Sequence, residues 1–252
     1  MAKAQKLSLG GEEFLSYHKT KGKNPGVVFL HGFKSDMSGA KALALEAFCK
    51  KQGRQFIRFD CRGHGESSGV FEDFRIGMAK EDTLAVLDKL CDGPQLLVGS
   101  SMGGWIMLLA AMARPQKVAG LVGIASAPDF TEHLLLDAFN EKQRGELQKN
   151  GRVMVPNCYG DEPYPISRDF IAESGEHLVL DGPIPITCPV HLIHGTMDDD
   201  VPWEFSMTLN EKLESKDVRT TLMKDGDHRL SSEKHLETVC KVAGKMLEKV
   251  SG

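Results

Sequence analysis

The sequence predicts an α/β fold, a doubly wound and mostly parallel sheet with helices on both faces. Short runs rich in β-branched and other apolar residues recur along the chain, and they are apolar almost throughout, as strands buried on both faces are. Amphipathic segments with helical spacing separate these runs, and this alternation indicates an open parallel sheet. A length of 252 residues suits one large domain, so we expect residues 1–252 to form a single domain.

The first half of the chain supplies its elements in regular order. The run GVVFLHG (26–32) predicts a strand, and a helical pattern follows at 39–52. RQFIRFD (54–60) predicts the next strand, which precedes a helix at 77–91. PQLLVGSS (94–101) predicts a further strand. In open sheets of this kind, functional residues lie in loops beyond the carboxyl ends of strands, so we expect each functional motif directly after a strand.

The second half continues the alternation. The runs LVGIASA and CPVHLIHG are as apolar as the earlier strands, and RTTLMKDGDH has the pattern of a strand that leads into a loop. Strands are therefore expected at 121–127, 188–195 and 219–228, and helices at 102–113, 204–214 and 232–249.

One region interrupts this order. From about Asp129 to Ser174 no strand pattern is apparent, and a helical patch (FTEHLLLDAFNEKQRGELQK) precedes the loop-like stretch NGRVMVPNCYGDEPYP. An insertion of this size between two core strands is most simply a lid over the carboxyl edge of the sheet. We therefore expect a small helical cap at about 129–174.

Composition excludes several classes of partner. The chain is 41% apolar and 26% charged with a formal net charge of −4, so it offers no basic surface for nucleic acid. Its longest apolar run, Trp105 to Ala113, is shorter than the roughly 20 residues that cross a bilayer. The start, MAKAQKLSLG, has no signal-peptide pattern. We expect a soluble protein with no membrane span, and the oligomeric state stays open.

The cysteines indicate a reducing compartment. They are widely scattered, form no CxxC pair, and do not cluster with histidine at zinc-ligand spacing. Several lie beside apolar runs, where a free thiol behaves as a small buried hydrophobe. The six are Cys49, Cys61, Cys91, Cys158, Cys188 and Cys240. No metal site is predicted.

The stretch LLVGSSMGGW carries a candidate nucleophile. Gly99-Ser100-Ser101-Met102-Gly103 matches G-x-S-x-G with Ser101 at its centre, whereas Ser100 lacks the symmetric glycines. The pattern places a serine on a sharp turn between strand and helix, with small residues that let the two approach closely. A plain glycine-serine turn is the alternative. The strand before the motif and the helix after it favour the nucleophile.

A serine nucleophile needs a base, and the base needs a carboxylate to orient it. In HLIHGTMDDDVPW, Asp198 lies nearest the strand end, and Asp199 and Asp200 fit an acidic turn before the next helix. Of the nine histidines, His228 combines a loop after the last strand with the chain order serine, acid, histidine. His194, followed by glycine at a strand end, is interpreted as structural.

Two backbone amides are the candidate oxyanion donors. The N–H of Met102 lies at a helix start, beside the serine. The N–H of Phe33 lies in the loop after the early strand, where Gly32 lets the chain bend towards the serine. The glycines of FDCRGHGESSG do not match G-x-G-x-x-G, so that loop is interpreted as structural and no dinucleotide cofactor is expected.

The motifs HGF, FDCRGHGES, GSSMGG, HGTMDDDVP and GDH, in this order, resemble the α/β-hydrolase family of serine hydrolases. The resemblance implies the α/β-hydrolase fold, with Ser101 as nucleophile, Asp198 as acid and His228 as base. It implies Phe33 and Met102 as oxyanion donors, and no metal or organic cofactor.

A narrower resemblance links KALALEAFCKKQG, GPQLLVGSSMGGW and GPIPITCPVHLIHG to a group of mitochondrial and bacterial members. It implies a palmitoyl-protein thioesterase, an acyl-glucuronide esterase or both, acting on acyl-proteins or small-molecule esters. It also implies a mitochondrial location if a presequence has been removed, and otherwise a cytoplasmic one. A general carboxylesterase, a peptidase and a non-hydrolytic ligand-binding protein stay open as alternatives.

The cap supplies candidate substrate contacts. Phe130, Leu134 and Phe139 fall near helical spacing and could line a channel for an acyl chain. Alternatively, these side chains simply pack the cap onto the sheet.

Overall fold

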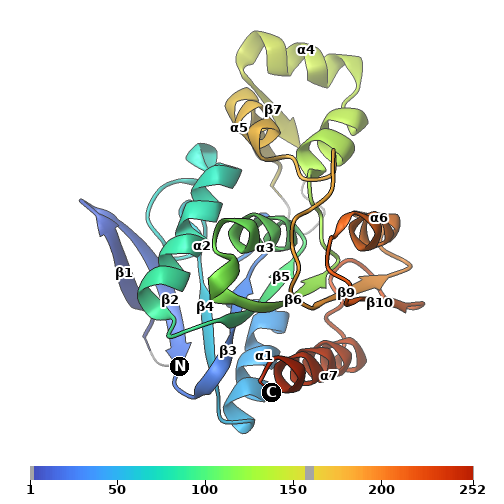
Figure 1. Cartoon of the computed structure of the whole chain (residues 1–252). Coiled ribbons are helices and arrows are strands. Elements are labelled where there is room, and N and C mark those ends of the chain that lie inside the picture. The colour runs from blue at the N-terminus through green and yellow to red at the C-terminus, as the bar shows by residue number, and fades with distance from the viewer. Residues whose placement is uncertain (1–2, 157–161, 252) are drawn as a thin grey trace.

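A computed structural model of the chain describes residues 3–156 and 162–251 (Figure 1). Its centre is an eight-stranded sheet in the order β1-β2-β4-β3-β5-β6-β9-β10. The pairs from β4 through β10 are parallel, whereas β2 runs antiparallel to both β1 and β4. The strands are β1 (Gln5–Gly10), β2 (Glu13–Thr20), β3 (Lys23–Leu30), β4 (Arg54–Phe59), β5 (Gln95–Ser100), β6 (Val118–Ile124), β9 (Val190–Gly195) and β10 (Val218–Met223).

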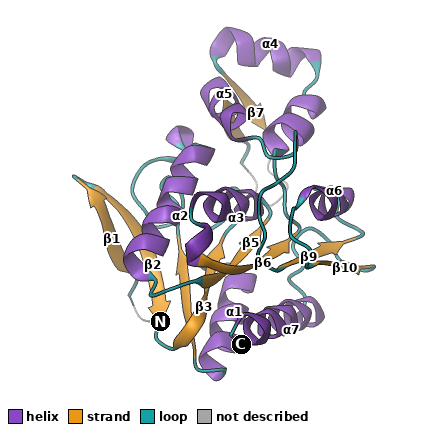
Figure 2. Ribbon diagram, in the orientation of Figure 1, coloured by secondary structure: helices purple, strands orange, loops and turns teal. Residues whose placement is uncertain are grey.

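Helices cover both faces of the sheet, as Figure 2 shows. Successive residues of a strand point to opposite faces, so Val27 and Phe29 of β3 join one apolar cluster while Val28 and Leu30 join the other. Helices α1 and α7 pack on the first face, and α2 and α3 on the second. The core helices are α1 (Ala40–Lys51), α2 (Ile76–Leu90), α3 (Met102–Ala113), α6 (Glu204–Lys212) and α7 (Glu233–Val250).

The segment between β6 and β9 stands beyond α2 and α3 at the top of Figure 1. It contains a π-helical turn, a two-stranded hairpin and two helices, and we call it the cap segment. Its parts are the turn Thr131–Leu136, α4 (Glu141–Asn150), β7 (Arg152–Val155), β8 (Tyr164–Ser167) and α5 (Arg168–Ser174).

The hairpin in the cap segment corrects the expectation that this region holds no strand. β7 and β8 pair only with each other, in antiparallel register from Arg152↔Ser167 to Val155↔Tyr164. Each is four residues long, and β8 contains Pro165, so neither gives the continuous apolar run by which the core strands were predicted.

The cap segment is tied to the core by hydrogen bonds. Glu173 accepts the amides of Ile76 and Gly77 at 3.0 and 2.8 Å, at the start of α2. The indole N–H of Trp105 donates to the carbonyl of His177 at 3.0 Å. Buried Asp129 accepts the amides of residues 179 and 180 where the chain returns to the core.

Two further expectations concern cysteines and membranes. In the described part of the chain, the free thiols are Cys49, Cys61, Cys91, Cys188 and Cys240. The sixth cysteine, Cys158, lies outside the described residues. Within residues 3–156 and 162–251, no helix combines the length and the apolar composition needed to cross a bilayer.

Candidate active site

Ser101 occupies a sharp turn between β5 and α3. Its backbone has φ 55° and ψ −122°, a left-handed conformation that costs a non-glycine residue energy. A Cβ on Gly99 would lie 2.3 Å from the carbonyl oxygen of Gly103, and one on Gly103 would lie 2.3 Å from that of Leu30. The two glycines of the motif are therefore required by the close approach of strand and helix.

Ser101, His228 and Asp198 form one hydrogen-bonded chain. Nε2 of His228 lies 3.0 Å from Ser101 Oγ, and its Nδ1 lies 2.8 Å from Asp198 Oδ2. A carboxylate only accepts, so Nδ1 carries the proton in the neutral ring and Nε2 is free to accept from the serine hydroxyl. The structure thus brings together three side chains that are 127 and 30 residues apart along the chain.

The side chain of Asp198 is buried, and both its oxygens are hydrogen-bonded. Oδ1 accepts the amides of Asp200 and Val201 at 3.0 and 2.8 Å, in the turn after β9. Burial alone would raise the pKa of the carboxyl, but hydrogen bonds from His194 and His228 outweigh it and hold the pKa well below its usual range. The group is therefore a carboxylate at neutral pH.

His194 is a neighbour of this site that sequence reasoning missed. Its Nε2 lies 3.1 Å from Asp198 Oδ2 and 2.9 Å from the Val201 carbonyl, and its Nδ1 lies 2.7 Å from Ser206 Oγ. Both Nε2 partners only accept, so Nε2 carries the proton and Nδ1 accepts from the serine hydroxyl. The signal in the sequence was the spacing of four residues between His194 and Asp198 across the turn.

The two predicted oxyanion donors flank Ser101. Met102 is the first residue of α3, so its amide belongs to the first turn and has no acceptor within the helix. A Cβ on Gly32 would lie 3.3 Å from the Cβ of Ser101, so the loop after β3 passes directly beside the serine. Phe33 follows in that loop and lines the same hollow as Ser101.

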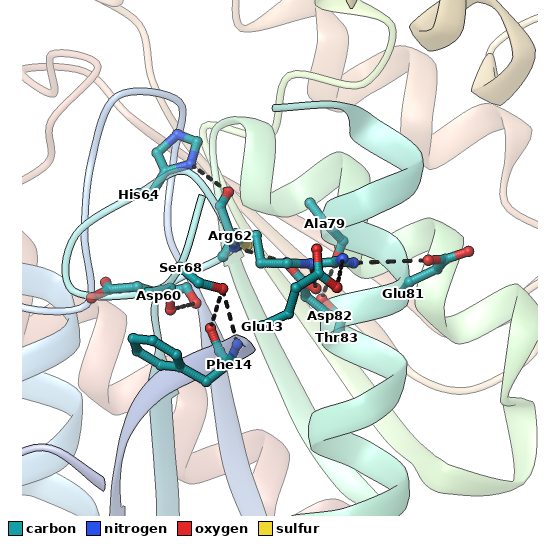
Figure 3. A network of polar contacts seen from close by, with 12 residues as sticks. Glu13, Phe14, Asp60, Arg62, His64, Ser68, Ala79, Glu81, Asp82 and Thr83 are labelled. Carbon is teal, nitrogen blue, oxygen red and sulfur yellow. Dashed lines mark hydrogen bonds and ion pairs between the residues drawn. The ribbon is translucent and has the colours of Figure 1, made fainter. Parts of the chain in front are cut away.

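The loop FDCRGHGESSG is hydrogen-bonded to segments that surround the site. Buried Asp60 accepts the amide of Met37 at 2.7 Å, where the loop after β3 ends, and the amide of Glu66 at 2.9 Å. Figure 3 shows Arg62 reaching from the same loop to Asp82 on α2, at 2.7 Å. These contacts agree with the structural interpretation of the loop.

An apolar pocket of about 180 Å³ opens at Ser101 and His228. Phe130 and Leu134 of the cap segment line it together with Phe33, and its charged lining residues are Lys34 and Asp200. Phe139, the third predicted substrate contact, is not part of this lining and is buried in the apolar core at 6% exposure. We call this hollow the acyl pocket.

A second, more polar pocket of about 440 Å³ also reaches Ser101 and His228. Its charged lining comprises Lys34, Lys41, Arg229 and Asp36. Lys41 donates to the carbonyl of Arg229, and burial lowers the pKa of its ammonium to about 8. We call this hollow the polar pocket.

One group of side chains has the spacing of metal ligands. An oxygen each of Asp198 and Asp200 and a ring nitrogen of His228 lie within 4.8 Å of one another. Both ring nitrogens of His228 already face hydrogen-bond partners, Asp198 and Ser101. A cation here would compete with that chain of hydrogen bonds, so the arrangement suits proton transfer better than metal binding.

Comparison with known sequences gives concordant matches. A family model described as alpha/beta hydrolase fold matches residues 25–160. The mouse protein named palmitoyl-protein thioesterase ABHD10, mitochondrial, is 42% identical over 240 residues, which cover 94% of this chain and 80% of the relative. The human protein of that name is 42% identical over 241 residues, covering 94% and 78%.

Solved structures agree. Alpha/beta hydrolase domain-containing protein 10 from mouse superposes with a TM-score of 0.91 at 39% identity, over 99% of this chain and 100% of that one. Est1E from Butyrivibrio proteoclasticus, solved with ferulic acid, superposes with a TM-score of 0.81 over 99% and 100%. Because its identity is only 23%, the second match supports the fold and nothing more.

Proposed function

The chain belongs to the α/β-hydrolase fold family and hydrolyses ester or thioester bonds, and we propose that its preferred substrates are long-chain acyl thioesters on protein cysteines. The proposal has two supports. One is the name of the relatives, palmitoyl-protein thioesterase, at 42% identity. The other is an apolar pocket that meets the hydrogen-bonded Ser101 and His228.

In the proposed reaction, Ser101 Oγ attacks the acyl carbonyl while His228 Nε2 takes the hydroxyl proton. The amides of Phe33 and Met102 donate to the oxyanion, a contribution of roughly 3–4 kcal/mol per donor. Collapse of the tetrahedral intermediate breaks the carbon–sulfur bond, and His228 returns its proton to the leaving thiol. Asp198 stabilises the imidazolium throughout.

Water completes the cycle. His228 takes a proton from water as the water oxygen attacks the acyl-enzyme carbonyl, and Ser101 leaves with that proton. The products are a free fatty acid and a protein thiol.

The observation that carries the proposal is the junction of the acyl pocket with Ser101. Side chains of Phe33, Phe130 and Leu134 offer an apolar wall to a hydrocarbon chain whose carbonyl lies at the serine. Each methylene that leaves water is worth about 0.8 kcal/mol. A long chain is therefore expected to bind here more strongly than a short one.

Matched substrates test the proposal. Steady-state hydrolysis of palmitoyl and acetyl groups, each as thioester and oxyester, is measured for the wild type and Ser101→Ala. Serine-dependent preference for the palmitoyl thioester is expected. Preference for short oxyesters would instead indicate a general carboxylesterase, and absence of turnover would indicate a ligand-binding protein.

A second candidate activity, acyl-glucuronide hydrolysis, is favoured by the polar pocket. Lys34, Lys41 and Arg229 give the polar pocket beside Ser101 an excess of positive charge over Asp36. A glucuronide leaving group carries a carboxylate that would be attracted there. Hydrolysis of one acyl group as its glucuronide and as a neutral glucoside would measure this preference.

A mitochondrial location is proposed because both named relatives carry that word in their names. Subcellular fractionation tests it, and a cytoplasmic location is expected if no presequence is removed.

A further inference from the structure

A second apolar cavity adjoins the acyl pocket at Phe33. It has a volume of about 130 Å³ and lies between the core and the cap segment. Aromatic and aliphatic side chains make most of its wall, and its charged lining consists of Glu72 and Arg152. The apolar lining comprises Phe33, Phe71, Phe74, Pro165, Ile166 and Phe170. We call this hollow the distal cavity.

Phe33 is the wall that the two hollows share. Its ring lies 5.5 Å from that of Phe130 and 5.8 Å from that of Tyr164, both of which line the acyl pocket. It lies 5.1 Å from the ring of Phe71 and 5.4 Å from that of Phe170, both of which line the distal cavity. Phe33 is therefore the residue that the linings of both hollows have in common.

The ring of Phe33 packs against six aromatic rings and is not fully enclosed by them. Phe33 is only half-buried, unlike Phe74 and Phe170, which are 2% and 4% exposed. It belongs to the loop after β3, and side chains on such loops change rotamer more easily than those locked inside a sheet. Rotation of this one side chain would join the two hollows.

We propose that the distal cavity binds the terminal carbons of a long acyl chain attached at Ser101, with the ring of Phe33 as the gate between the two hollows. The proposal rests on the proposed function, which places the acyl carbonyl at Ser101. It makes Phe33 a chain-length determinant through its side chain, in addition to the role of its backbone amide. Each methylene that enters the cavity changes kcat/KM by roughly fourfold.

Two substitutions probe the cavity from opposite directions. Ile166→Phe adds volume to the wall of the distal cavity, from a side chain that is 1% exposed. Phe33→Ala removes the partition. Met154→Phe is the matched control, because Met154 lies in the same hairpin but is 48% exposed and does not line the cavity.

The measured quantity is the ratio of kcat/KM for palmitoyl over octanoyl substrates. We expect Ile166→Phe to lower this ratio at least tenfold and Phe33→Ala to raise it, with no change in Met154→Phe. Circular dichroism of each variant reports whether the protein is folded. A ratio that stays constant in both cavity variants, or that moves equally in the control, would overturn the proposal.

Parallel thioester and oxyester series separate this inference from the proposed function. If only oxyesters are hydrolysed but the ratio moves as expected, the distal cavity stands and the thioesterase proposal fails. If thioesters are hydrolysed with an unchanged ratio, the cavity proposal fails alone. Inactivation rates with octyl and hexadecyl fluorophosphonates give the same ratio in the absence of turnover.

Discussion

Ser100 and Ser101 are adjacent in sequence but face different surroundings. Ser100 ends β5 and is 5% exposed, whereas the hydroxyl of Ser101 faces His228 at the mouth of the acyl pocket. We expect Ser101→Ala to lower kcat by roughly 10⁴-fold or more with the fold intact, because a serine nucleophile has no substitute. Ser100→Ala is expected to keep most of the activity. Steady-state kinetics with circular dichroism checks both, and the reverse ranking would contradict the assignment.

Asp198 is expected to be more sensitive than its two acidic neighbours. In Asp198→Asn, the amide group would donate to His228 and favour the wrong tautomer, an effect worth roughly 10⁴-fold in kcat in serine proteases. Asp199→Asn and Asp200→Asn are matched controls that change the same charge in the same turn, and we expect much smaller losses. Equal losses at the three positions would exclude Asp198 as the unique orienting acid.

His194 is expected to act as a positioning residue through Asp198. Loss of a hydrogen bond to a charged group costs about 1.5–3 kcal/mol, so His194→Leu should lower kcat by roughly tenfold to a hundredfold. His194→Gln offers an N–H near the place of Nε2 and should restore part of that activity. If both variants lose activity equally and in step with stability, the residue is merely structural.

At the scale of elements, Glu173 connects the cap segment to α2. Its two oxygens accept the amides of Ile76 and Gly77, and the side chain of the N-cap residue, Arg75, makes no capping hydrogen bond. We expect Glu173→Ala to lower the free energy of unfolding by about 1–2 kcal/mol, the usual cost of a lost cap. Hydrogen exchange of residues 141–156 and 162–174 should also accelerate. Exchange that is unchanged in these residues would contradict a connecting role.

The sequence predicted the core elements because they bury long apolar patterns. The predicted helix at 102–113 and the strand at 54–60 match α3 (Met102–Ala113) and β4 (Arg54–Phe59) closely. The sequence patterns did not predict β1 and β2. β1, QKLSLG, is at the sheet edge and alternates between exposed and half-buried residues, so it lacks the run of apolar residues that marks a parallel strand.

The sequence could predict those residues of the candidate site that come directly after a strand. Ser101 and Asp198 follow β5 and β9, and His228 lies in the loop after β10. His194 was not assigned to the site, because its bond to Asp198 depends on how the turn at 196–201 folds. Phe139 was expected to contact the substrate, but it is buried and does not line the acyl pocket. Helical spacing alone does not tell which face of the cap segment meets the pocket.

At the scale of the whole molecule, the depressed pKa of Asp198 couples stability to pH. A carboxyl whose pKa is lower in the folded than in the unfolded chain, where it is about 3.9, stabilises the fold above that value. This contribution is lost as the pH falls further. We expect the difference in unfolding free energy between the wild type and Asp198→Asn to shrink as the pH falls from about 5 to below about 4. Urea denaturation across this range measures it, and a difference that grows on acidification would contradict the assigned direction.

The most direct test of the central claim is covalent labelling with an alkyl fluorophosphonate, followed by peptide mapping. The proposed chain of Ser101, His228 and Asp198 predicts a single adduct on Ser101, absent from Ser101→Ala and retained in Ser100→Ala. An adduct on Ser100, or labelling that persists in Ser101→Ala, would contradict it.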